Sequence, residues 1–151
     1  MKKIIILQVI CWLCINCHSQ IYVSLNQLNN TIWKVSIGNA NYPIINKYAF
    51  TKKSVTDVNE FNYCDAKGNK KYKKYENTWL YYLSNIIPSS FDKTKAGNIN
   101  KGKYIVIQSK TGFTCYQFMY ISDKELHIKP AYRNKSDVIG IPETIRYVRV
   151  N

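Results

Sequence analysis

The most constraining feature of this sequence is a series of three apolar, aromatic-rich runs within residues 103–129. Residues 103–109 are rich in β-branched side chains, and residues 113–121 resume the pattern after a break that contains Gly112. Residues 125–129 then alternate polar and apolar side chains up to Pro130, which cannot donate a hydrogen bond to a sheet. The segment therefore predicts three consecutive strands paired as an antiparallel meander.

The middle run carries apolar bulk on both of its faces. Strand alternation assigns Tyr116, Phe118 and Tyr120 to one face and Cys115, Gln117, Met119 and Ile121 to the other. A flat sheet with one solvated face would not need this pattern. It favours a sheet that is rolled over a filled or ligand-holding interior, while its outer face packs on neighbouring segments.

The rest of the chain predicts further strands separated by closely spaced turns. The expected strands cover residues 31–37, 48–58, 61–64, 72–83 and 143–150, with a short additional strand near Phe91 and a turn at residues 65–69. Residues 21–30 predict a short helical or coiled lead-in. No amphipathic helix is expected after the N-terminal segment, so the fold class is all-β: an antiparallel up-and-down meander that closes into a barrel of about eight strands.

The N-terminal segment is typical of a secretory signal peptide. Lys2 and Lys3 precede an apolar stretch that is too short for a membrane-spanning helix of ~20 residues. Cleavage after Ser19 would leave residues 20–151 as one β-barrel domain, secreted or periplasmic. Lipidation at Cys17 would instead give an outer-membrane lipoprotein. No transmembrane span is expected after signal removal, and the Lys, Asn, Ile and Tyr bias suggests a bacterial source.

The cysteines and the net charge further limit the kinds of protein that this chain can be. Only Cys64 and Cys115 follow the signal segment, and in an oxidising compartment they could form one disulfide or stay as buried thiols. The formal charge of the whole chain is +13. Lysine is dense near residue 70: Lys67, Lys70, Lys71, Lys73 and Lys74, with tyrosines between them.

These lysines predict a basic surface. In an intracellular protein such a run would suggest nucleic-acid binding, but export argues against that partner. The plain alternative is a solvated hairpin tip whose lysines discourage pairing between sheet edges. The remaining alternative is contact with an acidic polysaccharide, lipid headgroups or another envelope component.

The order of the predicted elements resembles the bacterial lipocalin-like domain proteins, which are small exported barrels. The resemblance covers most of residues 25–150 and rests on Trp33 soon after the lead-in, on the consecutive hairpins, and on the turn and strand at residues 121–128. Thr31 stands where that family carries glycine. The resemblance implies that Arg146 or Arg149 lies across Trp33, and that the barrel binds a small hydrophobic ligand.

Six aromatic residues are candidates for the barrel interior and for ligand contact: Trp33, Trp79, Tyr81, Tyr104, Phe118 and Tyr120. Tryptophan and tyrosine combine bulk with one polar tip, which suits a pocket for an amphipathic ligand. The same side chains also fill small barrels completely where no ligand is bound.

Catalytic signatures are absent from the sequence. His127 is the single histidine after the signal segment, so a multi-histidine metal site is not expected, and alternation places it beside Glu125 on a solvated face. Pairing of His127 with Cys64 or Cys115 as a nucleophile is a weak alternative. We therefore expect no enzyme activity, no metal and no cofactor. The leading hypothesis is a ligand-binding barrel, and the runner-up is a filled barrel or sandwich that binds an acidic polymer or envelope partner through its basic surface.

Overall fold

The structure, a computed structural model, describes residues 20–38, 43–134 and 143–150 as an eight-stranded closed barrel. The barrel strands are β2 (Thr31–Ile37), β3 (Ile44–Phe50), β4 (Ser54–Cys64), β5 (Lys70–Ser84), β7 (Tyr104–Ser109), β8 (Gly112–Ile121), β9 (Glu125–Pro130) and β10 (Ile145–Val150). Neighbours pair antiparallel in chain order, and β10 closes the wall by pairing with both β9 and β2. The predicted all-β meander is confirmed.

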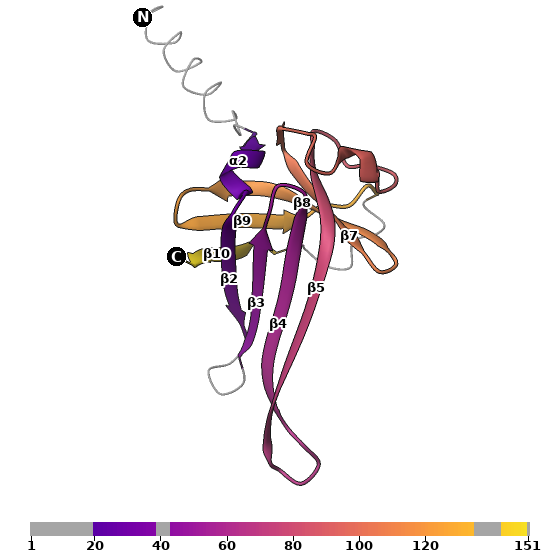
Figure 1. Cartoon of the computed structure of the whole chain (residues 1–151). Helices are drawn as coiled ribbons and strands as arrows, with labels where there is room; N and C mark the ends of the chain where they lie inside the picture. The colour runs from indigo at the N-terminus through magenta and orange to yellow at the C-terminus, as the bar shows by residue number, and fades with distance from the viewer. Residues whose placement is uncertain (1–19, 39–42, 135–142, 151) are drawn as a thin grey trace, which may run out of the picture.

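The barrel wall is uneven in length. Strands β2 to β5 run alongside one another, β8 to β10 cross them, and the β4–β5 hairpin projects beyond the rest (Figure 1). Strand β5 pairs with β4 from Lys70 to Leu80, but it pairs with β7 only from Tyr81 to Ser84. The first part of β5 therefore pairs along one edge only. Its side chains, from residue 70 to residue 78, are exposed to solvent.

The predicted lead-in contains a short helix, α2 (Leu25–Leu28), preceded by β1 (Val23–Ser24). The Ser24 backbone N–H donates to Gln27 Oε1 at 2.8 Å, which completes a capping box at the helix start. Leu25 and Leu28 are buried in the barrel core. Strand β1 pairs with β6 (Lys101–Gly102), a two-residue pairing that the sequence did not reveal.

The barrel core is aromatic and aliphatic. Side chains from α2 and from all eight barrel strands form one buried cluster, including Trp33, Phe50, Tyr81, Phe118 and Ile128, and each of these is less than 4% exposed. Burial of this apolar surface stabilises the fold, at roughly 25 cal/mol for each Å² removed from water. The sequence predicted a sheet rolled over a filled or ligand-holding interior; the rolled sheet is confirmed, and side chains of the chain itself pack inside it.

A second apolar cluster lies outside the barrel wall. Tyr82, Val106 and Cys115 point away from the core and pack against Ile87 and Phe91, from the segment between β5 and β6. The Tyr82 and Phe91 rings are 5.2 Å apart. This cluster explains why the strands from residue 104 onward are apolar on both faces.

Three of the predicted strands differ in the structure. The expected strand at 48–58 is divided into β3 and β4 by a turn in which Thr51 Oγ1 accepts hydrogen bonds from the Ser54 and Lys53 backbone N–H groups. The run at 61–64 is the end of β4. Near Phe91 the chain forms no strand; instead the Asp92 side chain accepts from the Thr94 N–H and starts a 3₁₀ turn, η1 (Lys93–Lys95).

Candidate functional site

Four of the six predicted interior aromatics lie in the barrel core: Trp33, Trp79, Tyr81 and Phe118. Trp33 is fully buried, its Nε1 donates to Thr31 Oγ1 at 2.7 Å, and the Arg149 guanidinium lies 5.9 Å from the centre of its ring. Of the two arginines considered, Arg149 is therefore the one across the tryptophan. The Tyr81 hydroxyl donates to the Thr51 carbonyl oxygen at 2.9 Å. These contacts describe packed, hydrogen-bonded core residues.

The other two predicted interior aromatics lie outside the core, and the prediction is corrected there. Tyr104 packs in the outer cluster, because Ile105 and Ile107 are the inward residues of β7. Tyr120 is 45% exposed and contacts the His127 ring. A bulge between Phe118 and Tyr120 shifts the register of β8, so that Ile121 takes the inward position instead.

A polar network crosses the inner face of the barrel beside the core. The rings of Tyr48 and Tyr147 are stacked with centroids 5.4 Å apart, and the Tyr147 hydroxyl donates to Asn46 Oδ1 at 2.8 Å. The Asn46 amide donates in turn to Asp57 Oδ1 at 2.6 Å and to Asn59 Oδ1 at 3.1 Å. The sequence analysis missed this network, because the long predicted strand at 48–58 hid the pairing between β3 and β4.

Burial perturbs the titratable groups of this network. Desolvation raises the pKa of Tyr48 and Tyr147, so both hydroxyls stay protonated and available as donors. Desolvation also raises the pKa of Asp57, although the amides of Asn46 and Asn59 oppose that shift by donating to its carboxylate. The buried polar atoms of these side chains thus have hydrogen-bond partners, and the network adds a polar region to the inner face of the barrel.

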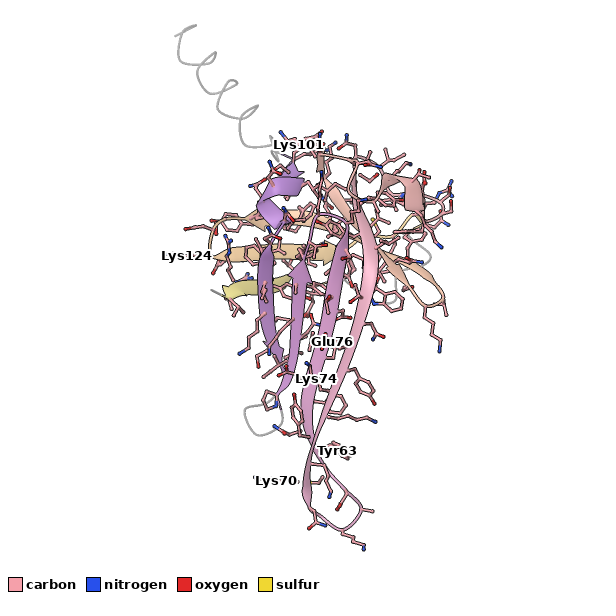
Figure 2. All side chains as sticks on the ribbon, viewed as in Figure 1. Tyr63, Lys70, Lys74, Glu76, Lys101 and Lys124 are labelled. Atoms are coloured by element: carbon pink, nitrogen blue, oxygen red, sulfur yellow. The ribbon has the colours of Figure 1, made fainter. Side chains whose placement is uncertain are left out.

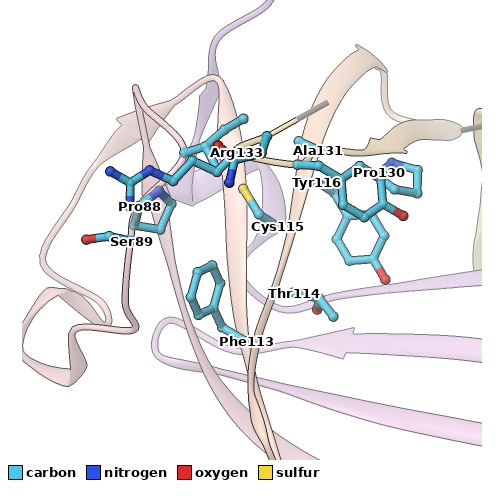
Figure 3. A pocket seen from close by; sticks show the side chains of 12 residues that line it. Pro88, Ser89, Phe113, Thr114, Cys115, Tyr116, Pro130, Ala131 and Arg133 are labelled. Carbon is cyan, nitrogen blue, oxygen red and sulfur yellow. The ribbon is translucent and has the colours of Figure 1, made fainter. Parts of the chain in front are cut away.

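A pocket of about 410 Å³ lies over β8, at the place where β9 separates from it. Its apolar lining includes Ile87, Pro88, Phe113, Cys115, Pro130 and Ala131, and the exposed Arg133 side chain also lines it. The Cys115 thiol and the Tyr116 ring point to opposite sides of β8 (Figure 3). The pocket therefore continues the outer apolar cluster, and none of the six predicted aromatic residues is among the residues that line it.

Cys115 contributes a neutral surface to this pocket. Burial raises the pKa of its thiol to about 12, so the thiolate, which is the nucleophilic form, is scarce at neutral pH. His127 lies elsewhere along the β8–β9 pair: it is opposite Tyr120, with its Nε2 3.2 Å from Glu125 Oε2. The structure does not bring the cysteine and the histidine together.

Cys64 and Cys115 are not joined by a disulfide in the structure. Cys64 is exposed at the end of β4, on the projecting hairpin, whereas Cys115 is buried in β8 opposite Val106. The disulfide considered from the sequence is therefore not formed in the structure, since the length of the β4–β5 hairpin carries Cys64 beyond the barrel wall. The candidate lipidation residue Cys17 and the expected cleavage position after Ser19 lie outside the described residues.

The predicted basic residues lie on the projecting hairpin, where Tyr63 and Lys70 mark its far part (Figure 2). The predicted turn is confirmed: Asp65 Oδ1 accepts from the backbone N–H groups of Lys67 and Asn69, and Gly68 has a φ of 80°. Strand alternation divides the lysines, because Lys71 and Lys73 share the inner face of the barrel wall whereas Lys70 and Lys74 share its outer face. The basic segment is thus two-sided.

Within the described ranges, no three histidine, cysteine or acidic side chains gather as a metal site would require. A search of the same residues for helices of membrane-spanning length and hydrophobicity also found none. Comparison of the chain with protein-family models, with curated proteins and with solved structures found no match.

Proposed function

We propose that the chain is an exported, non-enzymatic binding protein that takes a small amphipathic acid in the pocket over β8. The observation that carries the proposal is the pocket itself, whose apolar lining is accompanied by the guanidinium of Arg133. Its volume of about 410 Å³ lies within the range of ~300–1,000 Å³ that is usual for small-molecule sites. Export is proposed from the N-terminal sequence, through cleavage after Ser19 or lipidation at Cys17.

The chemistry of the lining selects an amphipathic ligand with an acidic head. Ile87, Pro88 and Phe113 offer apolar surface, and the protonated Cys115 thiol adds to it. Arg133 offers a permanently charged guanidinium that can pair with a carboxylate through two hydrogen bonds. A fatty acid or a similar apolar acid satisfies both parts of the site.

This location differs from the barrel interior, which the sequence analysis favoured. Trp33, Tyr81 and Phe118 are each at most 2% exposed in the packed core, so a ligand there would have to displace them. The outer pocket needs no such rearrangement, because the segments at 87–89 and 130–134 already stand apart over β8.

Calorimetric titration with decanoate and with decanol tests the proposal. Arg133→Gln should weaken decanoate binding by about fivefold, which corresponds to about 1 kcal/mol, the upper end for an exposed charged contact, and should leave decanol binding unchanged. Ala131→Trp should fill the pocket and weaken both ligands. Arg146→Gln, at an exposed arginine of β10, is the charge-matched control.

Two results would contradict the site. One is decanoate binding that survives Ala131→Trp, and the other is an equal loss in the Arg133 and Arg146 variants. Native mass spectrometry of protein purified from its own host provides an independent test: a retained small mass that Ala131→Trp removes supports the pocket, and a bare polypeptide opposes it.

A further inference from the structure

The inner face of the projecting hairpin carries a row of aromatic and basic side chains outside the closed part of the barrel. Five residues define this row, which we call the hairpin platform: Phe61, Tyr63, Lys71, Lys73 and Tyr75. The strand register places Tyr63 opposite Lys71 and Phe61 opposite Lys73, with Tyr75 next in line on β5. Side chains at these positions share one face of the two-stranded ribbon.

The aromatic members of the platform already contact one another. Phe61 and Tyr75 are stacked at 29° with centroids 5.9 Å apart, and Phe61 lies 6.2 Å from Tyr63. Tyr63 and Tyr75 are nonetheless 41% and 45% exposed, because β7 does not pair with this part of β5. Solvent-exposed aromatic rings in a continuous row are typical of a binding surface and are costly to leave in water.

The charge of the platform is positive and only weakly opposed. Lys73 Nζ lies 4.8 Å from the centre of the Tyr75 ring, and Lys71 Nζ is 4.0 Å from Asp65 Oδ2. On the opposite face Lys74 forms an ion pair of 2.8 Å with Glu76, and Lys47 forms one of 2.8 Å with Glu60. The two faces of the hairpin therefore differ: Glu76 and Glu60 add carboxylates to the outer face, whereas within the described residues Lys73 on the inner face forms no ion pair and is available to an anion.

We propose that the hairpin platform binds an acidic polysaccharide. The C–H faces of pyranose rings pack against exposed aromatic rings, and the carboxylates of a uronic acid chain can pair with Lys71 and Lys73. An open, elongated surface suits a linear polymer, whereas a small ligand requires an enclosed pocket. This site is separate from the pocket over β8 and does not depend on ligand binding there.

Other polymeric partners fit the surface less well. A peptide strand could add to the open edge of β5, but lysines at four of its first five positions discourage strand pairing. Single-stranded nucleic acid also uses stacking and cations, and it is the nearest competitor. This preference rests on the proposed export of the chain, since an exported protein meets acidic glycans more readily than nucleic acid, and nucleic acid therefore serves as the alternative outcome of the test.

The test uses polygalacturonate, neutral dextran and an oligothymidylate as probes of the mature protein. Lys71→Gln/Lys73→Gln should weaken polygalacturonate binding by about tenfold, which is the upper end of the effect expected from the loss of two exposed charge pairs. Lys101→Gln/Lys124→Gln removes the same charge at the lysines labelled away from the hairpin in Figure 2 and should change binding less than about twofold. Tyr75→Ser should also weaken binding without changing net charge.

Each outcome of this experiment decides the proposal. Selective loss in the Lys71/Lys73 and Tyr75 variants, with weak dextran binding, supports it. Equal losses in the two double-lysine variants, or tighter binding of oligothymidylate than of polygalacturonate at equal salt, overturn it. The unfolding midpoint of each variant confirms that the barrel is intact, and decanoate titration of the same samples keeps this result distinct from the pocket over β8.

Discussion

At the scale of single residues, Asp57 shows how the barrel interior couples to pH. Its carboxylate accepts from Asn46 and Asn59 within a half-buried network, and desolvation raises its pKa above the ordinary value of 3.8. Between that value and the raised one, the folded state binds more protons than the unfolded state does. The contribution of Asp57 to stability is therefore fully present below pH 3.8 and is lost as the pH rises through the folded pKa.

The loss of this stabilisation with rising pH can be tested with Asp57→Asn. The amide cannot ionise, so the variant should gain stability relative to the parent chain as the pH rises from about 3.8 toward neutrality. Its altered hydrogen bonding adds only an offset that is independent of pH. Urea unfolding of both proteins across this range measures the difference, in which the titration of all other groups cancels. A difference that stays constant or shrinks with rising pH would contradict the raised pKa.

Residue patterns predicted the candidate sites unevenly. Alternation placed Trp33, Tyr81 and Phe118 in the core correctly, because their strands are regular up to those positions. It failed at Tyr120 because β8 has a bulge there. A bulge depends on how β8 pairs with β9, so the sequence of β8 alone does not reveal it. The pocket was also beyond sequence reasoning, because it forms where segments far apart in the chain meet over β8.

At the scale of elements, the order of the strands in the barrel could be predicted from the sequence, but the separate pairing of β1 with β6 could not. Successive hairpins with short turns make neighbours in sequence into neighbours in the sheet, and β10 then meets β2. The β1–β6 pair has only two residues in each strand, too few to produce any periodicity. The one residue of this pair whose identity reflects the pairing is Gly102. Its backbone approaches Ser84 so closely that a Cβ atom on Gly102 would lie 2.5 Å from the Ser84 nitrogen.

Gly102→Ala should therefore destabilise the protein. Both nearest atoms belong to the Ser84 backbone in β5, so neither can rotate away, and overpacking of this kind costs about 1–3 kcal/mol. Chemical denaturation would measure the loss. Lys101→Ala, at the exposed neighbour in the same short strand, should stay within about 0.5 kcal/mol of the parent. Equal unfolding midpoints for the two variants would show that β6 does not pack on β5 as described.

At the scale of the whole molecule, the chain combines a closed barrel with a projecting ribbon. The core cluster ends at Trp79 on β5, and residues 70–78 are exposed although they pair fully with β4. Few buried contacts hold the far part of the hairpin, so the barrel should not need it to fold. Such a ribbon is expensive to keep exposed with its aromatic rings in water, which is consistent with a role in binding.

Shortening the hairpin separates the two proposed activities. Glu60 and Lys74 face each other across the ribbon, so an Asn-Gly turn can join them in place of residues 61–73. The shortened protein should keep its β-type circular dichroism, an unfolding midpoint close to that of the parent, and decanoate binding at the pocket over β8. It should lose polygalacturonate binding, because four of the five platform residues are removed. A shortened protein that unfolds, or that binds the polymer as before, would show instead that the ribbon belongs to the barrel's own stability or that the anion site lies elsewhere on the surface.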